Sequence, residues 1–317
     1  MKKKLINNAY IEGYLYESNL EEKISGDTSK NPGVPYMRGS ISVATDEDFM
    51  NIVKISYMYE APTFKNGKEN SKFETLKSIK EGKIKSVMAD GKDVAAKVSV
   101  NSAMGLNEWF DDKNEDKPIS VQINQGGFIT VESEFKSEKT TDRDNFEADI
   151  VITHVELQEA DIEHELPERV KIKGAIFDFR GVLLPYEFTA QSQGAMNYFL
   201  GLEASNSNPV FTKIKGHQVS YVTTKEVTEE SAFGEASVRE VKSTHKNLMV
   251  TWAAAEAYVW DTPDTMLASE FAQKIQERQI ALATMKKDRE EYSAKSNATS
   301  SPAKANAIPS SGDKYIF

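Results

Sequence analysis

The chain has 317 residues, a formal net charge of −10 and no cysteine. This length suits about two domains, because one domain usually has ~100–200 residues. The lack of cysteine excludes disulfides, thiolate zinc sites and thiol nucleophiles. No segment approaches the ~20 apolar residues of a membrane span, and the lysines in residues 1–5 precede no apolar signal segment. We therefore expect a cytoplasmic protein that does not bind membranes.

A first module is expected over residues 1–135. Alternating apolar residues predict strands over residues 10–17, 36–43 and 51–59. Phe73, Leu76 and Ile79 are spaced as on one face of a helix, which predicts a helix over residues 70–82. Two more strands are expected at 83–88 and 94–100, and a closing hairpin at 119–123 and 128–131.

A charged stretch without periodicity, residues 136–147, is the expected linker to a second module over residues 148–261. This module repeats the pattern, with predicted strands at 150–157, 211–227, 236–241 and 248–260, a strand pair within 170–184 and a helix at 190–202. Residues 37–43 and 172–178 align as a basic residue, glycine, a small residue and alternating apolar positions, which indicates a duplication.

The C-terminal part is expected to be a helix followed by a tail. Thr262 is a suitable N-cap and Pro263 a suitable first residue for a helix over residues 262–292. Residues 293–317 have almost nothing to bury, so we expect a disordered tail. The tail ends abruptly in Tyr315, Ile316 and Phe317, which folding does not explain.

No motif indicates catalysis. The sequence has no phosphate-binding glycine loop, no nucleophile elbow and no His-Glu-x-x-His helix. The four histidines are scattered, and acids such as Asp111 and Asp112 lie in polar stretches that are usually solvated. We expect a protein that is not an enzyme and has no cofactor and no metal.

Aromatic residues on predicted strands indicate a binding face in the first module. Tyr14 and Tyr16 lie on one strand, Tyr57 and Tyr59 on another. Such rings can stack unpaired bases at ~1–3 kcal/mol per base without reading sequence. The segment between residues 64 and 97 contains nine lysines and five acidic residues. Its lysines could hold phosphates, and the candidates are Lys65, Lys72 and Lys77. The alternative is that the tyrosines fill a core.

The second module has a similar face. Lys171, Lys173, Phe177 and Phe179 alternate along one predicted strand, so they share one side of it. Cations that hold the backbone beside rings that hold the bases suit a single-strand groove. The alternative is again that the phenylalanines are buried in a core.

Two β-rich modules with aromatic and basic faces, a disordered tail and a short apolar end resemble a phage-type single-stranded DNA-binding protein with OB-fold modules. The resemblance implies a mainly β fold with minor α: two OB-like small β-barrels, a long C-terminal helix and a tail. It also implies that the tip, at Asp313, Tyr315, Ile316 and Phe317, recruits replication or recombination proteins. The chain departs from that family in having one acid instead of several, and no proline between Ile316 and Phe317.

These observations predict sequence-independent binding of single-stranded DNA in phage or plasmid replication or recombination. RNA stays open as a ligand, because stacking and phosphate contacts do not read the sugar. The rival hypothesis is a virion structural or assembly protein, whose aromatic faces would be buried against neighbouring proteins.

Overall fold

The computed structural model describes residues 4–27, 29–111, 114–161, 166–229, 237–262 and 265–299. Within these residues the chain is mainly β with a C-terminal helix, as predicted. It divides into two compact units, of which the first contains Met1–Asn107 and Val121–Ile275 and the second Glu108–Ser120 and Gln276–Phe317. No helix in the described part is long and apolar enough to span a membrane.

The first five strands pair in a closed circuit. They are β1 (Asn7–Ile24), β2 (Pro35–Ala44), β3 (Ile52–Glu60), β4 (Lys97–Asp111) and β5 (Asn114–Glu132), with α1 (Ser71–Lys80) and α2 (Val87–Asp90) between β3 and β4. Their order is β2-β3-β5-β4-β1, and β1 also pairs with β2. The β3–β5 pairing is parallel. We call this set the first circuit.

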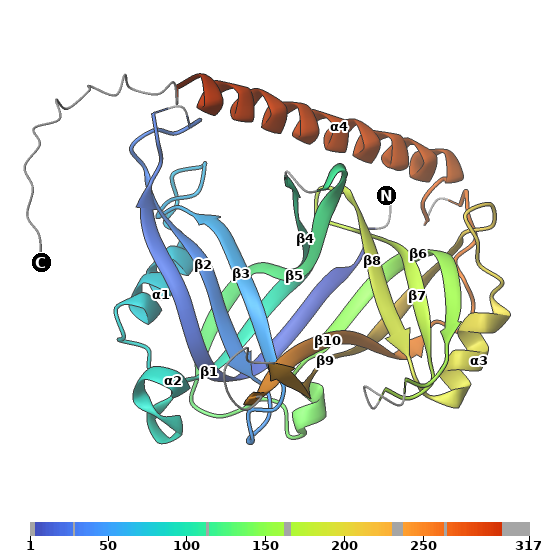
Figure 1. The fold of residues 1–317 in the computed structure, drawn as a ribbon, viewed down its shortest axis with the longest axis horizontal. Coiled ribbons are helices and arrows are strands. Elements are labelled where there is room, and N and C mark those ends of the chain that lie inside the picture. Colours follow the sequence, from blue (N-terminus) through green and yellow to red (C-terminus); the bar gives the residue numbers. More distant parts are fainter. Residues whose placement is uncertain are drawn as a thin grey trace, which may run out of the picture. The chain divides into compact units, whose positions relative to one another are not determined.

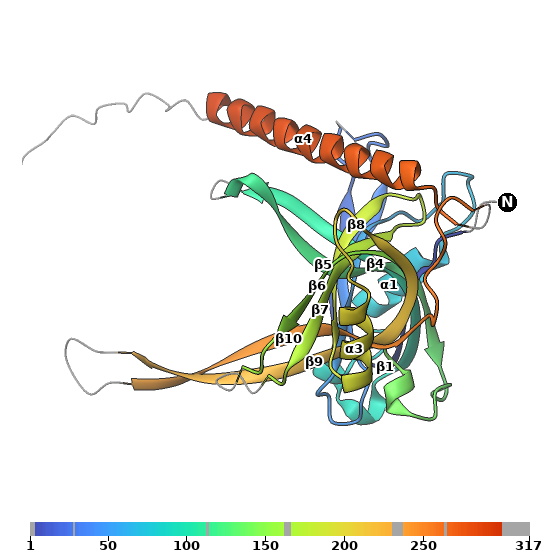
Figure 2. The same cartoon turned by 90° about the vertical axis from the view of Figure 1, so that its right-hand side faces the viewer.

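The next five strands repeat this arrangement as the second circuit. They are β6 (Asn145–Gln158), β7 (Arg169–Phe177), β8 (Leu183–Ala190), β9 (Val210–Glu229) and β10 (Ser237–Ala253), with α3 (Gln193–Gly201) between β8 and β9. The order is β6-β7-β8-β10-β9, and β9 also pairs with β6. β8 and β10 are parallel, and β1 joins β6 to give one ten-stranded sheet (Figure 1). Beyond the circuit, β9 and β10 continue as a two-stranded ribbon (Figure 2).

The strand registers show which positions correspond in the two circuits. Tyr14 pairs with Ala44, and a bulge follows Leu15. In the second circuit Val151 pairs with Ala175, and a bulge follows Ile152. In both circuits the bulge follows one residue after the named pair, so Tyr14 corresponds to Val151 and Ala44 corresponds to Ala175. The strand arrangement therefore repeats, but not in the alignment expected from the sequence: Val43, not Gly39, corresponds to Gly174.

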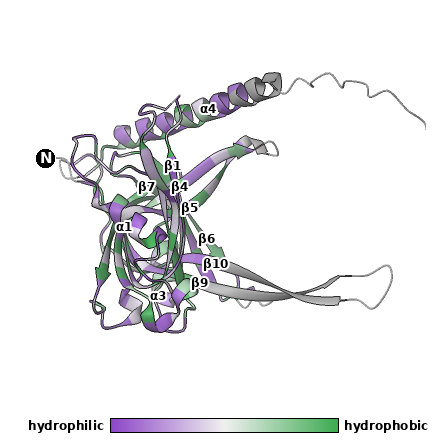
Figure 3. Cartoon of the chain, turned by 90° about the vertical axis from the view of Figure 1, so that its left-hand side faces the viewer, coloured by the Kyte–Doolittle hydropathy of each residue, from purple (hydrophilic) through white to green (hydrophobic). Residues whose placement is uncertain are grey.

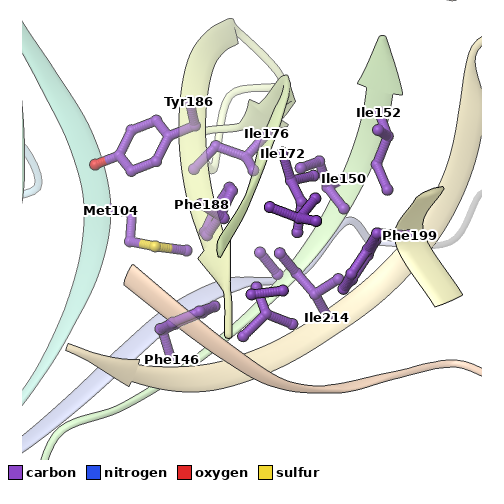
Figure 4. Packing of buried hydrophobic residues seen from close by; sticks show 14 of the residues in the cluster. Met104, Phe146, Ile150, Ile152, Ile172, Ile176, Tyr186, Phe188, Phe199 and Ile214 are labelled. Atoms are coloured by element: carbon purple, nitrogen blue, oxygen red, sulfur yellow. The ribbon is translucent and has the colours of Figure 1, made fainter. Parts of the chain in front are cut away.

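Each circuit has a core formed mainly by residues that alternate along its strands, and the second core also includes Ala9 of β1 and Met104 of β4. The first core holds the buried Ile11, Leu15, Ile41, Ile55 and Val100 together with the α1 residues Phe73, Leu76 and Ile79, which confirms the predicted helix face. The second core gathers Ile150, Ile172, Phe188, Phe199 and Ile214 (Figure 4). Hydrophobic and hydrophilic stretches follow one another along the strands, as this packing requires (Figure 3).

Several predicted elements differ from the structure. Residues 83–88 are not a strand, and the expected hairpin at 119–123 and 128–131 is one continuous strand, β5. The glycines that suggested its turn, Gly126 and Gly127, have positive φ angles inside β5. The last helix, α4 (Ala268–Thr299), begins after the predicted cap at Thr262. Pro263 and residues 300–317, with the tail tip, lie outside the described residues.

Candidate nucleic-acid interface

Aromatic side chains that are exposed or half-buried gather where β2 begins and β3 ends. The rings of Tyr36 and Tyr59 stack with centroids 4.5 Å apart, and Tyr59 is 45% exposed. Phe128, on the neighbouring β5, is 55% exposed. The parallel pairing of Ser56 with Gln125 places both Tyr59 and Phe128 three residues further along adjacent strands. We call Tyr36, Tyr59, Phe128 and Lys72 the first platform.

Lys72 connects the two aromatic positions of the first platform. Its Nζ lies 2.9 Å from a carboxylate oxygen of Glu60, the residue after Tyr59, and 5.4 Å from the centroid of the Phe128 ring. Asn70 caps α1 through Lys72 N and also donates to Glu60 (3.2 Å). The start of α1 therefore holds an ammonium group over an exposed ring, a cation–π arrangement.

Tyr57 is a correction to the predicted stacking residues. It is 1% exposed in the first core, and its hydroxyl donates to the carbonyl of Gly127 (3.4 Å). Burial also raises the pKa of this hydroxyl. Tyr57 alternates with Met58 along β3, so it points inward and cannot stack a base in this structure.

Phe177 is the second correction. It lies on the same outer face as Lys171 and Lys173, as predicted, but it is completely buried because Met266 and Phe271 cover that end of the face. Phe179, in the turn after β7, is 87% exposed beside the Arg180 guanidinium (5.5 Å). Its assignment stays a prediction.

Tyr14 and Tyr16 lie in a separate aromatic cluster. Tyr14 makes edge contacts with Phe49 (6.1 Å) and Phe135 (5.1 Å), and Tyr16 contacts Phe49 (5.6 Å). The ammonium of Lys92 lies 5.7 Å from the Tyr14 ring. Both tyrosines are only half-buried, so their role in binding stays a prediction. Part of their surface packs against Phe49 and Phe135 and stabilises the fold.

Phe135 of that cluster belongs to the segment after β5, which returns to β1. The fully buried Glu12 of β1 accepts hydrogen bonds from the backbone N–H groups of Lys136 (2.5 Å) and Ser137 (3.0 Å). Arg143 then stacks on Phe135, with its guanidinium carbon 3.8 Å from the ring centroid. Residues 136–147, expected as a linker, are therefore hydrogen-bonded to β1 in part.

The second circuit has the corresponding return segment. The fully buried Asp149 of β6 accepts from the backbone N–H of Ile6 (2.8 Å) and from the hydroxyl of Tyr258 (2.9 Å). Residues after β10 then pack on Phe177 and Phe211. The outer face beside the first strand is thus covered in both circuits.

The remaining predicted lysines are dispersed over the surface. Lys65 is exposed between β3 and α1, and the Nζ of Lys77 lies 6.0 Å from the Phe73 ring. Lys171 pairs with Glu187 (3.7 Å) and Lys173 with Glu156 (3.6 Å), so acids partly neutralise this face.

Polar side chains join the two circuits. Asn51 donates to Asp144 (2.6 Å) and to the carbonyl of Gln218 (2.9 Å), and Asn124 and Gln218 exchange two hydrogen bonds through their amides. His217 lies 3.0 Å from Asp144, whose pKa burial raises to about 6 even though His217 opposes the shift. Such a network fixes how the circuits meet, because each buried polar group needs its partner.

Sequence reasoning missed Tyr36 and Phe128. Tyr36 begins a correctly predicted strand, and its contact with Tyr59 depends on the β2–β3 pairing. Phe128 was assigned to a hairpin that does not form. Within the described residues, no group of three or more histidine and acidic side chains could hold a metal ion. Asp313, Tyr315, Ile316 and Phe317 lie outside them.

Comparison with known proteins places the chain in a family. The sequence model of the YorF family matches residues 5–288. The chain belongs to the YorF family. No curated protein matches it. Among solved structures, it is similar to a deletion mutant of the single-stranded DNA binding protein from Thermus aquaticus, at 11% identity and a TM-score of 0.46, covering 82% of this chain and 98% of that one. The wild-type protein gives 11% identity and a TM-score of 0.44, covering 81% and 94%.

Proposed function

We propose that the chain binds single-stranded DNA without regard to sequence, and that each circuit is an OB-like β-barrel. The first platform carries this proposal. It lies on the second, third and fifth strands of its circuit, and OB-folds bind oligonucleotides on the face of their second and third strands. Two exposed rings, the half-buried ring of Tyr36 and an ammonium group over the Phe128 ring suit unpaired bases and the adjoining phosphates.

Basic residues near the platform and on the second circuit would guide the backbone of the strand. Arg38 follows Tyr36 by two residues and is exposed, and Lys54 is exposed on the outer face of β3. Lys171 and Lys173 supply the corresponding charges on β7. Because the chain is acidic as a whole, these local cations would favour a flexible strand that reaches them over a rigid duplex.

The binding test uses a labelled oligo-dT of about 30 nucleotides and fluorescence anisotropy at low salt. Tyr59→Ala and Phe128→Ala should each weaken binding roughly 5- to 150-fold, the effect of losing ~1–3 kcal/mol of stacking. Met88→Ala removes an apolar side chain on α2 that is more exposed than Tyr59 or Phe128, and it should leave the affinity for oligo-dT unchanged. Duplex DNA and RNA of the same length are measured in parallel.

Two results would contradict the proposal. The wild-type chain could fail to bind oligo-dT, or the two platform variants could bind as tightly as Met88→Ala. A large ordered oligomer without affinity for nucleic acid would instead favour a structural or assembly role.

The biological setting is a further part of the proposal. Recruitment of replication or recombination proteins would depend on the tip residues Asp313, Tyr315, Ile316 and Phe317, in a phage or plasmid system. This part depends on the sequence resemblance and on no contact in the described residues.

A further inference from the structure

Trp252 is a half-exposed indole on β10, in the second circuit. It is 47% exposed, although large aromatic side chains usually contribute to cores. Val250, two residues earlier, is buried in the second core, and a bulge between them turns Trp252 outward. Trp252 pairs with Lys215 of β9, whose Nζ lies 5.2 Å from the indole centroid.

The strand registers make Trp252 the counterpart of Phe128. Since Ala44 corresponds to Ala175, Ser40 corresponds to Lys171, and their partners Ser56 and Thr189 correspond as well. Ser56 pairs in parallel with Gln125, and Thr189 pairs in parallel with Met249. Phe128 and Trp252 each follow those residues by three positions on the fifth strand of their circuit.

The two positions also share their chemistry. Both rings are about half exposed, and each has a lysine ammonium group over it at a similar distance. The lysines come from different elements, Lys72 from α1 and Lys215 from β9, so repetition of a local sequence does not explain the arrangement. Lys213 extends the basic surface, and Glu147 binds both Lys213 (3.0 Å) and Lys215 (3.6 Å).

We infer that Trp252, Lys215 and Lys213 form a second platform, which stacks an unpaired base of the same nucleic-acid strand that the first platform holds. This inference rests on the proposed function and adds a site on the second circuit. The hydrogen bonds among Asn51, Asp144 and Gln218 hold the two circuits together, so the spacing between the two platforms is fixed.

Tryptophan fluorescence tests this site directly. The chain has three tryptophans; Trp109→Phe leaves Trp252 and the half-buried Trp260, which packs on Phe211 (5.4 Å) and Phe271 (5.9 Å). Oligo-dT should quench the Trp109→Phe protein strongly. Adding Trp252→Phe should remove most of the quenching while anisotropy still reports binding, because a phenyl ring can stack but does not contribute the signal.

Affinity gives a second measurement. Trp252→Ala should weaken binding of a strand of about 30 nucleotides roughly 5- to 150-fold. Val259→Ala, which truncates an exposed apolar residue in the segment after β10, should bind like wild type. Should the Trp252→Ala protein fail to fold, the quenching comparison with Trp252→Phe decides the matter alone.

The outcomes separate this inference from the proposed function. If quenching persists without Trp252, or Trp252→Ala binds normally while Phe128→Ala does not, the second platform is wrong and single-strand binding stands. If wild-type protein does not bind oligo-dT, both are wrong.

Discussion

Glu12 should be one of the most sensitive positions for stability. Its carboxylate is fully buried and accepts two backbone hydrogen bonds from the segment that returns after β5. Hydrogen bonds to a charged group contribute ~1.5–3 kcal/mol each, and removing a partner leaves buried N–H groups unpaired. We therefore expect Glu12→Ala to lower the free energy of unfolding by ~3–5 kcal/mol. Glu12→Gln, which keeps one acceptor but turns an N–H donor toward the other amide, should cost ~1–3 kcal/mol.

Urea unfolding followed by circular dichroism measures these losses, and trypsin locates them. The return segment contains Lys136, Lys139 and Arg143, so loosening it should expose sites for tryptic cleavage before the circuits unfold. Glu17→Gln is the matched control, because Glu17 is exposed on the same strand. If Glu12→Gln matches this control in both midpoint and cleavage rate, the anchoring role of the buried carboxylate is refuted.

Three further predictions concern other parts of the chain. Burial raises the pKa of Asp144 from 3.8 to about 6, so the folded chain holds this proton more tightly than the unfolded chain. The free energy of unfolding should then fall by up to roughly 3 kcal/mol as the pH rises from about 4 to about 6, and a pH series of urea titrations should show that Asp144→Asn removes this slope. Gly216→Ala should cost ~3 kcal/mol in the same assay, because its Cβ would lie 1.9 Å from the carbonyl oxygen of Met249 and 2.8 Å from the Phe146 ring. Deletion of residues 313–317 should leave oligo-dT anisotropy unchanged and abolish capture of partner proteins from a host extract; weaker DNA binding would place the tail in the DNA site.

Periodicity predicted most elements, because local alternation decides which face of a strand is buried. The helix face of Phe73, Leu76 and Ile79 was correct, and the strands β2 and β3 were predicted within one residue at each end, whereas β1 and β6 are longer than predicted. The hairpin predicted around Gly126 and Gly127 was wrong. Two glycines between apolar runs resemble a turn, but here they let a continuous strand bend inside a closed circuit.

The candidate site was harder to predict, since exposure depends on what covers a face. Lys171, Lys173 and Phe177 do share one side of β7, yet residues far along the chain, Met266 and Phe271, bury Phe177. Strand alternation places Tyr57 and Tyr59 on the same face of β3, so it does not show that the core covers Tyr57 and leaves Tyr59 45% exposed. The correspondence of Phe128 with Trp252 depends on parallel pairings between distant strands, which no local pattern contains.

The N-terminal residues also have partners that appear late in synthesis. Ile6 bonds to Asp149, 143 residues further along the chain, and Ala9 is part of the second core. At ~5–20 residues per second, the ribosome would complete that partner on the order of 10 s after Ile6 was made. Until then, the first residues of β1 have no β6 to pair with, and an open strand end is a template for pairing with another chain. Folding of the first circuit during synthesis should therefore remain incomplete until β6 emerges.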